Sequence, residues 1–356
     1  MTVPVLGRRS LNRAYLARQL LLERHAMPVL DALEHLVGLQ AQAPAPPYLG
    51  LWSRLDGFAF DDLAGALERR DAVRLILMRG TIHLVSARDA AIRALVQPLL
   101  TRAIAPALTA HLPDALDAAR AFFAEAPRTD KEVRELIAGR WPDRDAAELA
   151  RAVRYTLPLV QTPPRGLWGK SGLARHTTLD TWLDAEPPAP TIDALVLRYL
   201  GAFGPASVRD VQQWSGLTDL GEIVARLAPG LREFRDEDGR VLYDLPDAPR
   251  PDADTPAPVR LVPEFDNLTL SHADRARVVS DAHRREIFTV NGIIRATLLV
   301  DGFVHGRWKL EHKNGTATVT IHPFAPIPDE QAVADEAGRL ASAAHPKADV
   351  RVEIAG

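Results

Sequence analysis

Residues 191–245 read TIDALVLRYLGAFGPASVRDVQQWSGLTDLGEIVARLAPGLREFRDEDGRVLYDL, and their pattern decides the fold. One helix is predicted over residues 191–200, a second begins after Ser207 as its N-cap, and a third covers residues 221–227. Two alternating strands follow, turned at Asp238-Gly239, one of the strongest short-range hairpin signals. Three helices followed by a hairpin is the element order of a winged helix.

A similar order begins near the N-terminus. Helices are predicted over residues 10–22, 28–39 and 60–70. The run AVRLILMRGTIHLVS, residues 72–86, is rich in branched residues and is interrupted by Arg79-Gly80, which predicts a hairpin. These elements predict another winged helix, although the two stretches share no strict sequence repeat.

The order appears once more in residues 128–176. Helices are predicted over residues 130–140 and 145–155, and LVQTPPRGLWGKSG (159–172) then suits a strand and an irregular wing because of its prolines and glycines. We therefore expect an α+β fold of three tandem winged-helix units and a C-terminal segment, divided into residues 1–115, 116–190, 191–250 and 251–356.

The C-terminal segment is predicted to be largely β. A Pro- and Asp-rich connection over residues 246–260 precedes it. The run RATLLVDGFVHGRWKLEHKNGTATVTIHPF, residues 295–324, alternates in polarity and carries turn signals at Asp301-Gly302 and Asn314-Gly315. A last helix is expected over residues 329–343, with one more strand in the tail.

Composition excludes several classes of function. With 47% hydrophobic and 25% charged residues, the chain of 356 residues is an ordinary globular protein. The absence of cysteine excludes a disulfide scaffold, a thiolate nucleophile and cysteine-based metal sites. The 11 histidines lack metal-ligand spacing on a predicted helix, and no intact dinucleotide- or phosphate-binding motif occurs, so we expect neither metal nor cofactor. No stretch suits a membrane span or signal peptide, which predicts a cytoplasmic protein without membrane contact.

Two glutamines follow the second predicted helix. Gln40 and Gln42 lie in a segment that is predicted to be extended because Pro44 ends the preceding helical pattern. Residues two apart in an extended segment point to the same side, so both amides face one space. From the residues alone, the simpler interpretation is a pair of amides that satisfies free backbone groups at a helix end.

Charge gives only a local indication of a nucleic-acid partner. The formal net charge is −3, with 43 Lys and Arg against 46 Asp and Glu. Three winged-helix units nevertheless favour duplex binding, with packing modules as the alternative. Basic side chains in the predicted wings and hairpins, each of which is alternatively a solvated charge, are candidates for phosphate contacts: Arg79, Arg165, Lys170, Arg175, Arg307, Lys309 and Lys313.

Several stretches together resemble the AlkZ-like winged-helix DNA glycosylases, over about residues 10–325. They are LNRAYLARQLLLERHAMPVLDALEHLVGLQAQAPAPPYLGLWSRL, RGTIHLVS, PPRGLWG, GPASVRDVQQWSGL, PEFDNLTLSHADR and VDGFVHGRWK. The most specific element is the Gln-apolar-Gln motif, which falls on Gln40 and Gln42. A sister branch carries Gln-apolar-Asp, so the resemblance places this chain with the AlkZ branch.

This resemblance implies a C-shaped protein in which three winged helices line a concave basic surface for double-stranded DNA. It implies a cofactor-free, monofunctional glycosylase that excises alkylated purines of the N7-alkylguanine type, with Gln40 and Gln42 orienting the attacking water. Members of the branch protect antibiotic producers from bulky adducts or interstrand crosslinks. A monomer is expected because three units in one chain can clasp DNA. The alternatives are a non-catalytic winged-helix regulator and a glycosylase for simple methylpurines.

Three further residues are weaker candidates. His83 lies in RGTIHL and faces either the DNA or the packed interior of the wing. Asp266, in PEFDN, either supports the catalytic pocket or caps a turn, and the second role is favoured. His305 continues the hairpin that starts at Asp301-Gly302, which is the favoured probe of a DNA groove, although the sequence does not decide between the two late hairpins.

Overall fold

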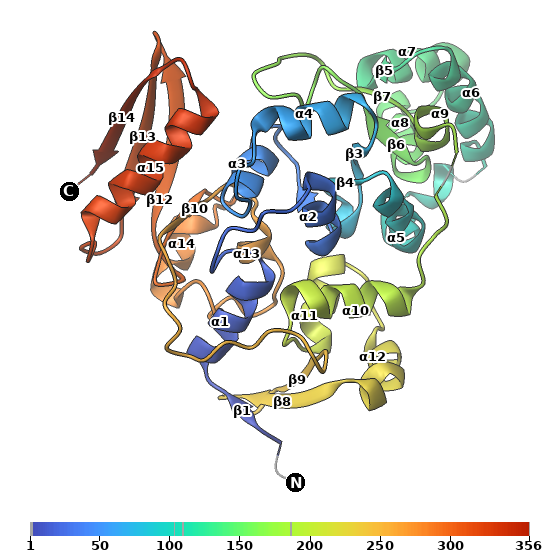
Figure 1. Ribbon diagram of the computed structural model, residues 1–356. Coiled ribbons are helices and arrows are strands. Elements are labelled where there is room, and N and C mark those ends of the chain that lie inside the picture. Colours follow the sequence, from blue (N-terminus) through green and yellow to red (C-terminus); the bar gives the residue numbers. More distant parts are fainter. Residues whose placement is uncertain (1–2, 103, 109, 186, 356) are drawn as a thin grey trace.

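The computed structural model describes residues 3–102, 104–108, 110–185 and 187–355, and shows a mixed α+β fold. Figure 1 shows the chain passing from a central group of helices to a helical lobe, then to a small sheet beside the N-terminus, and finally to a long twisted sheet next to the C-terminus. None of the helices among these residues is long and apolar enough to cross a membrane.

The stretch over residues 191–245 forms the predicted elements. They are α10 (Ile192–Phe203), α11 (Val208–Ser215), α12 (Gly221–Leu227), β8 (Arg232–Asp236) and β9 (Val241–Asp244). The Ser207 side chain accepts a hydrogen bond from the backbone N–H of Asp210, and so caps α11 as predicted. Gly239 has φ +78° in the hairpin turn, a conformation that favours glycine. Ala206 bridges to Tyr243, so a short strand segment between the first two helices joins the hairpin.

The same element order occurs in the first two predicted regions. The first comprises α2 (Val29–His35), β2 (Leu39–Gln40), α3 (Pro46–Trp52), α4 (Phe60–Glu68), β3 (Ala72–Ile76) and β4 (Ile82–Ser86). The second comprises α6 (Leu112–Glu125), β5 (Arg128–Thr129), α7 (Asp130–Arg140), α8 (Ala146–Thr156), β6 (Leu159–Gln161) and β7 (Arg175–Thr178). Their strands form one sheet, β2-β4-β3-β6-β7-β5, in which β3 pairs antiparallel with β6.

Three local details differ from the expectation. The helix predicted over residues 28–39 is shorter, because Val37 and Gly38 have φ of +53° and +83° and turn the chain into β2. The boundary predicted between residues 115 and 116 falls inside α6. Neither α6 nor α5 (Ile92–Thr101) was predicted, and neither was α3. The strand β1 (Val5–Leu6) pairs in parallel with β8, so the N-terminal residues pack on the third region rather than the first.

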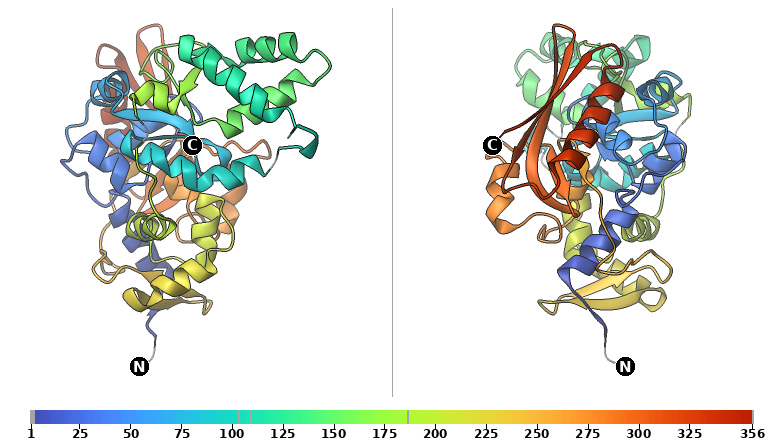
Figure 2. Two further views of the ribbon diagram at one scale, coloured as in Figure 1. Left: turned by 90° about the vertical axis from the view of Figure 1, so that its right-hand side faces the viewer. Right: turned by 60° about the vertical axis from the view of Figure 1, so that its left-hand side comes forward.

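The C-terminal sheet has the order β10-β11-β12-β13-β14. Its strands are β10 (Arg260–Val262), β11 (Thr297–Val300), β12 (Phe303–Lys313), β13 (Thr316–Pro323) and β14 (Asp349–Ile354). The helix α15 (Glu330–Ala344) covers one face of this sheet, and Figure 2 shows it between the sheet and the N-terminal half of the chain. Both predicted turns form, at Asp301-Gly302 and Asn314-Gly315.

The turn at Asp301-Gly302 is packed against α1 (Arg8–Arg18) and does not project. The Asp301 carboxylate accepts hydrogen bonds from Arg9 and Arg13, and Asn12 Nδ2 donates to the Gly302 carbonyl at 2.8 Å. A Cβ at Gly302 would lie 2.5 Å from Leu16. The turn is therefore held against α1, and a role of this hairpin as the probe of a DNA groove stays a prediction for the part of β12 beyond the turn.

Candidate active site

The backbone around the glutamine pair is held on every side by distant residues. The strand β2 pairs with β4, and the Ala41 N–H continues the ladder by donating to the Ile82 carbonyl at 2.7 Å. The Ala41 carbonyl accepts a hydrogen bond from Arg74 Nη2 at 2.7 Å, and Asn267 Nδ2 donates to the Gly38 carbonyl at 2.9 Å. The loop therefore has one defined conformation before any ligand binds.

Gln42 presents its side chain at the surface. Its Oε1 accepts a hydrogen bond from the backbone N–H of Ile82 at 3.3 Å, so the side chain takes the place that a backbone carbonyl would have in the ladder. The residue is exposed, and its amide nitrogen has no hydrogen-bond partner among the described residues. The arrangement fixes the oxygen end of the amide and leaves the NH2 group accessible.

Gln40 is the last residue of β2 and, unlike the exposed Gln42, it is buried. Its side chain is 7% exposed, and Oε1 accepts a hydrogen bond from Arg79 Nη2 at 2.8 Å. Beyond Gln40 the chain bends, so the extended segment predicted through Ala43 is shorter than expected. One amide is thus fixed by a buried cation and the other by the edge of the sheet.

Arg79 was predicted to contact phosphate, but its guanidinium is turned into the protein. It donates hydrogen bonds to Gln40 Oε1 and to the Trp214 carbonyl. Burial lowers the pKa of Arg79 to about 10, and repulsion from Arg275 contributes. Arg79 therefore positions Gln40, and the phosphate prediction is corrected because both Nη atoms are engaged inside the protein.

His83 is packed beneath Gln40, which fits the interior alternative. It is 1% exposed, pairs with Gln40 in the β2–β4 register, and its Nδ1 donates to the Thr81 carbonyl at 3.0 Å. Burial and the neighbouring Arg79 lower the pKa of His83 to about 3, so the imidazole is neutral at physiological pH. It contributes shape and packing to the site, and no charge.

Arg74 supports the motif from the other side of the sheet. It is 2% exposed, and beyond its bond to the Ala41 carbonyl its Nε and Nη1 atoms have no hydrogen-bond partner within the described part of the chain. Burial lowers its pKa to about 10, with a contribution from Arg165. Sequence analysis did not identify Arg74, because it lies within an apolar strand and shows no motif of its own.

Asp266 has the capping role that was favoured for it. Its Oδ1 accepts a hydrogen bond from the Leu268 N–H at 2.9 Å, at the start of α13 (Asn267–Leu270). The same carboxylate forms a buried two-point ion pair with Arg54, at 2.7 and 2.9 Å. Asp266 directly precedes Asn267, the first residue of α13, and it is Asn267 that donates a hydrogen bond to the Gly38 carbonyl, so Asp266 acts on the glutamine loop through its neighbour.

The predicted basic residues of the second region lie in different environments. Arg165 is half-buried and donates to the Gly172 carbonyl at 3.2 Å within the loop over residues 162–174. Lys170, in the same loop, is exposed and makes no ion pair among the described residues. Arg175 lies on β7 and is paired with Glu132 at 3.2 Å, so its charge is already compensated.

The predicted basic residues of β12 share one face of that strand. Side chains alternate between the two faces of a strand. One face of β12 carries Trp308, Leu310 and His312 and is turned toward α15, and the opposite face carries His305, Arg307 and Lys313. His305 Nε2 lies within 3.0 Å of the Pro326 carbonyl, and Lys309 pairs with Glu311 at 2.6 Å. Arg307 and Lys313 make no ion pair among the described residues and are the cations of this face that are free for a partner.

A cavity of about 510 Å³ opens beside the glutamine loop. Its wall begins at Ala43, directly after Gln42, and includes the start of α3, residues 167–170, residues 263–264 and β12. Trp168 and Trp308 contribute two indole rings. These rings come from segments that are distant in the chain from Gln40 and Gln42.

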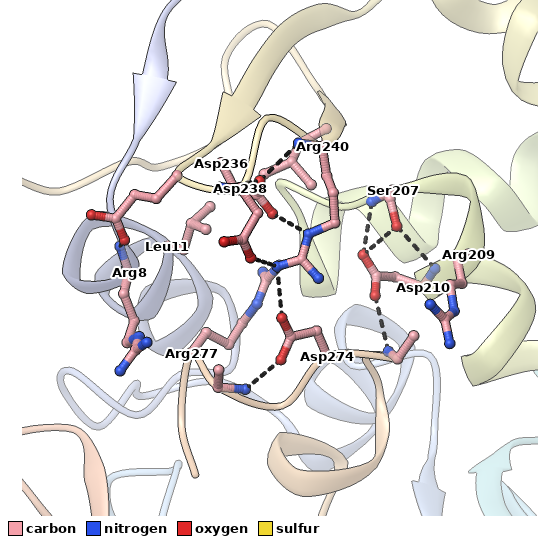
Figure 3. A pocket seen from close by; sticks show the side chains of 14 residues that line it. Arg8, Leu11, Ser207, Arg209, Asp210, Asp236, Asp238, Arg240, Asp274 and Arg277 are labelled. Carbon is pink, nitrogen blue, oxygen red and sulfur yellow. Dashed lines mark hydrogen bonds and ion pairs between the residues drawn. The ribbon is translucent and has the colours of Figure 1, made fainter. Parts of the chain in front are cut away.

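A second cavity, of about 150 Å³, is rich in carboxylates (Figure 3). Arg240 pairs with Asp236, Asp238 and Asp274 at 2.6–2.7 Å, and Asp210 accepts hydrogen bonds from Ser207 and Ala273. These acids are satisfied by the protein itself. Within the described residues no group of three or more His, Cys, Asp or Glu side chains could hold a metal ion.

Comparison with known proteins gives a family assignment. The model of the family described as DNA glycosylase AlkZ-like matches residues 33–343. Among solved structures, the fold is similar to that of Streptomyces sahachiroi DNA glycosylase AlkZ, with a TM-score of 0.80 and 20% sequence identity over 99% of this chain and 100% of that chain. No curated protein matches the sequence. The family match covers the glutamine loop and most of the residues around it, and the chain therefore belongs to the AlkZ-like family of DNA glycosylases.

Proposed function

We propose that the protein hydrolyses the N-glycosidic bond of alkylated purines, of the N7-alkylguanine type, in double-stranded DNA. The observation that carries this proposal is the Gln42 amide, which is exposed on a loop held by hydrogen bonds, and whose NH2 group has no partner among the residues that the structure describes. Together with the buried, oriented amide of Gln40, it suits the binding of one water molecule rather than proton transfer.

The chemistry of the substrate explains why amides suffice. Alkylation at a purine ring nitrogen makes the base cationic, so the leaving group needs no general acid. The transition state resembles an oxocarbenium ion, toward which neutral water is reactive. Amide oxygens accept hydrogen bonds from this water and an amide NH2 fixes its orientation, which replaces a bimolecular encounter by a preassociated one. Neither glutamine offers an amine nucleophile, so we propose a monofunctional enzyme.

We further propose that the three regions of identical element order are winged helices arranged in a C around the DNA. The free cations Lys170, Arg307 and Lys313 would make phosphate contacts. The proposal includes a monomer acting in the cytoplasm, in base-excision repair or in self-resistance against bulky adducts or crosslinks.

The direct test is excision from a duplex that carries one N7-methylguanine. Purified protein is incubated with the labelled duplex, and hot alkali then reveals abasic sites as strand breaks. We expect breaks with the wild type and none above background with the Gln40→Ala/Gln42→Ala double variant. Intact DNA with the wild type, together with tight duplex binding, would favour the non-catalytic regulator instead.

We expect the single-turnover excision rate to vary by no more than about twofold between pH 6 and pH 9, because neither glutamine titrates and the pKa of His83 is lowered to about 3. Stability should behave differently. The unfolded chain binds a proton at His83 below about pH 6.5, whereas the folded chain does not, so stability falls as the pH decreases from 6.5 toward 3. A bell-shaped rate profile centred within pH 6–9 would contradict the amide mechanism.

A further inference from the structure

We propose that Arg275 and Arg284 form a binding site for one phosphate group of the DNA backbone, near Arg79, which holds Gln40. This inference rests on the proposed function, since it takes duplex DNA as the ligand, and it adds a phosphate site to it. Arg275 lies in the segment between α13 and α14 (Arg284–Ile287), two helices that Figure 1 labels.

Three guanidinium groups gather here without an opposing carboxylate. Burial is the main cause that lowers the pKa of Arg79 and of Arg275, and repulsion adds to it, from Arg275 in the first case and from Arg284 in the second. Arg275 and Arg284 form no salt bridge within the described part of the chain, and the neighbouring Asp274 is already paired with Arg240 at 2.7 Å. Cations that lack an anion of their own are stabilised by one from outside the protein.

The Arg275 side chain is held flat against an aromatic ring. Its guanidinium carbon lies 4.3 Å from the centre of the Phe288 ring, which is the arrangement of a cation–π contact. Its Nε is buried, and the side chain makes no hydrogen bond to any residue that the structure describes. The ring covers one face of the guanidinium and leaves its edge, where a planar fork of N–H donors binds phosphate with two hydrogen bonds.

The backbone that carries Arg275 is fixed before DNA arrives. The Arg275 carbonyl accepts hydrogen bonds from the N–H groups of Val278 at 2.9 Å and Val279 at 2.8 Å. Two residues earlier, the Ala273 N–H donates to the Asp210 carboxylate at 2.9 Å. A site whose backbone is already ordered binds its ligand at a low cost in entropy.

A bound phosphate also has a use in the proposed reaction. Arg79 Nη2 donates to Gln40 Oε1 at 2.8 Å, and the charge of Arg275 acts on Arg79. Uncompensated cations on this side of Gln40 oppose the positive charge that develops on the sugar in the transition state. A phosphate held by Arg275 offsets them, and so favours bond cleavage as well as binding.

The salt dependence of binding tests the site on an unmodified duplex, from which no base can be excised. The dissociation constant is measured by fluorescence anisotropy over a series of NaCl concentrations. Because each phosphate contact releases counterions, we expect the slope of log Kd against log salt to fall by about 0.9 in Arg275→Met. Affinity should fall about tenfold, as the loss of a charge-assisted hydrogen bond implies. Arg275→Lys keeps the charge and should retain the slope.

Two further variants make the result specific. Arg284→Met, at the exposed start of α14, should lower the slope in the same direction, and it keeps the test independent of any effect of Arg275→Met on folding. Arg232→Met is the matched control, since Arg232 also lies over a phenylalanine ring, that of Phe234 at 5.5 Å, but belongs to β8. It should leave both slope and affinity unchanged.

Duplexes with a single neutral methylphosphonate locate the phosphate. Each backbone phosphate flanking one N7-methylguanine is replaced in turn, and a 2′-fluoro sugar suppresses loss of the base. We expect one position at which the replacement weakens binding to the wild type about tenfold and weakens binding to Arg275→Met no further. A wild-type slope in both methionine variants, or equal losses in wild type and Arg275→Met at every position, would overturn the inference.

Failure of the glycosylase proposal looks different. The wild type would then leave N7-methylguanine in an ordinary duplex, while the salt slope and the methylphosphonate series would still report on the phosphate site.

Discussion

Gln42→Ala is expected to lower the single-turnover excision rate on N7-methylguanine DNA by about 100-fold or more, with little change in stability. The size follows from losing the group that orients the attacking water, because poor placement of reactants alone costs about this much. Stability changes little because Gln42 is exposed, and water can replace its oxygen at the Ile82 N–H. The rate is measured with enzyme in excess, and the melting temperature of each variant is recorded.

Gln40→Ala separates the two roles that the structure gives to the pair. It should reduce the rate as well, but it also removes the acceptor of the buried Arg79 guanidinium, at a cost of roughly 1–3 kcal/mol. The exposed Gln331 on α15 provides the control, and Gln331→Ala should match the wild type. If Gln42→Ala kept the wild-type rate, water orientation by this amide would be ruled out.

Asp266→Ala should lower the free energy of unfolding by about 3–5 kcal/mol. The substitution leaves the Arg54 guanidinium buried without its anion and removes the N-cap of α13. Both side chains are at most 2% exposed, so solvent cannot take the place of the missing partner. Urea denaturation followed by circular dichroism gives the difference between the two proteins.

Two companions of this variant identify the cause. Asp266→Asn keeps an acceptor for the Leu268 N–H and should cost less than the alanine substitution. Arg54→Met/Asp266→Ala removes both charges and should be more stable than Asp266→Ala alone, because no unpaired ion remains in the interior. If the double variant were the least stable of the three, the buried charge would not explain the loss.

Local chemistry made much of the fold predictable. The turns at Asp238-Gly239 and Asn314-Gly315 formed as expected because each places a glycine at positive φ, of 78° and 79°. The Ser207 cap was equally clear. In contrast, α5 and α6 were not predicted although both have an apolar face, and α5 contains Pro98, a residue that usually interrupts a helix.

The candidate site was only partly predictable for a different reason. Gln40 and Gln42 stood out in the sequence, but the residues that define their surroundings come from other elements. Arg79 reaches Gln40 across 39 residues, and Trp168 lies beside the same loop because β3 pairs with β6. Such long-range pairing is set by the packing of whole elements, and no local pattern encodes it.

The pairing of β1 with β8 also bears on how the chain acquires its structure during synthesis. Val5 and Leu6 lie beside Arg235 and Asp236, so β1 is synthesised long before the strand with which it pairs. Until then its backbone groups and the exposed Val5 side chain have no native neighbour. The small sheet of the third region is therefore completed by the beginning of the chain, and a product that stops before β8 would leave β1 without its partner strand.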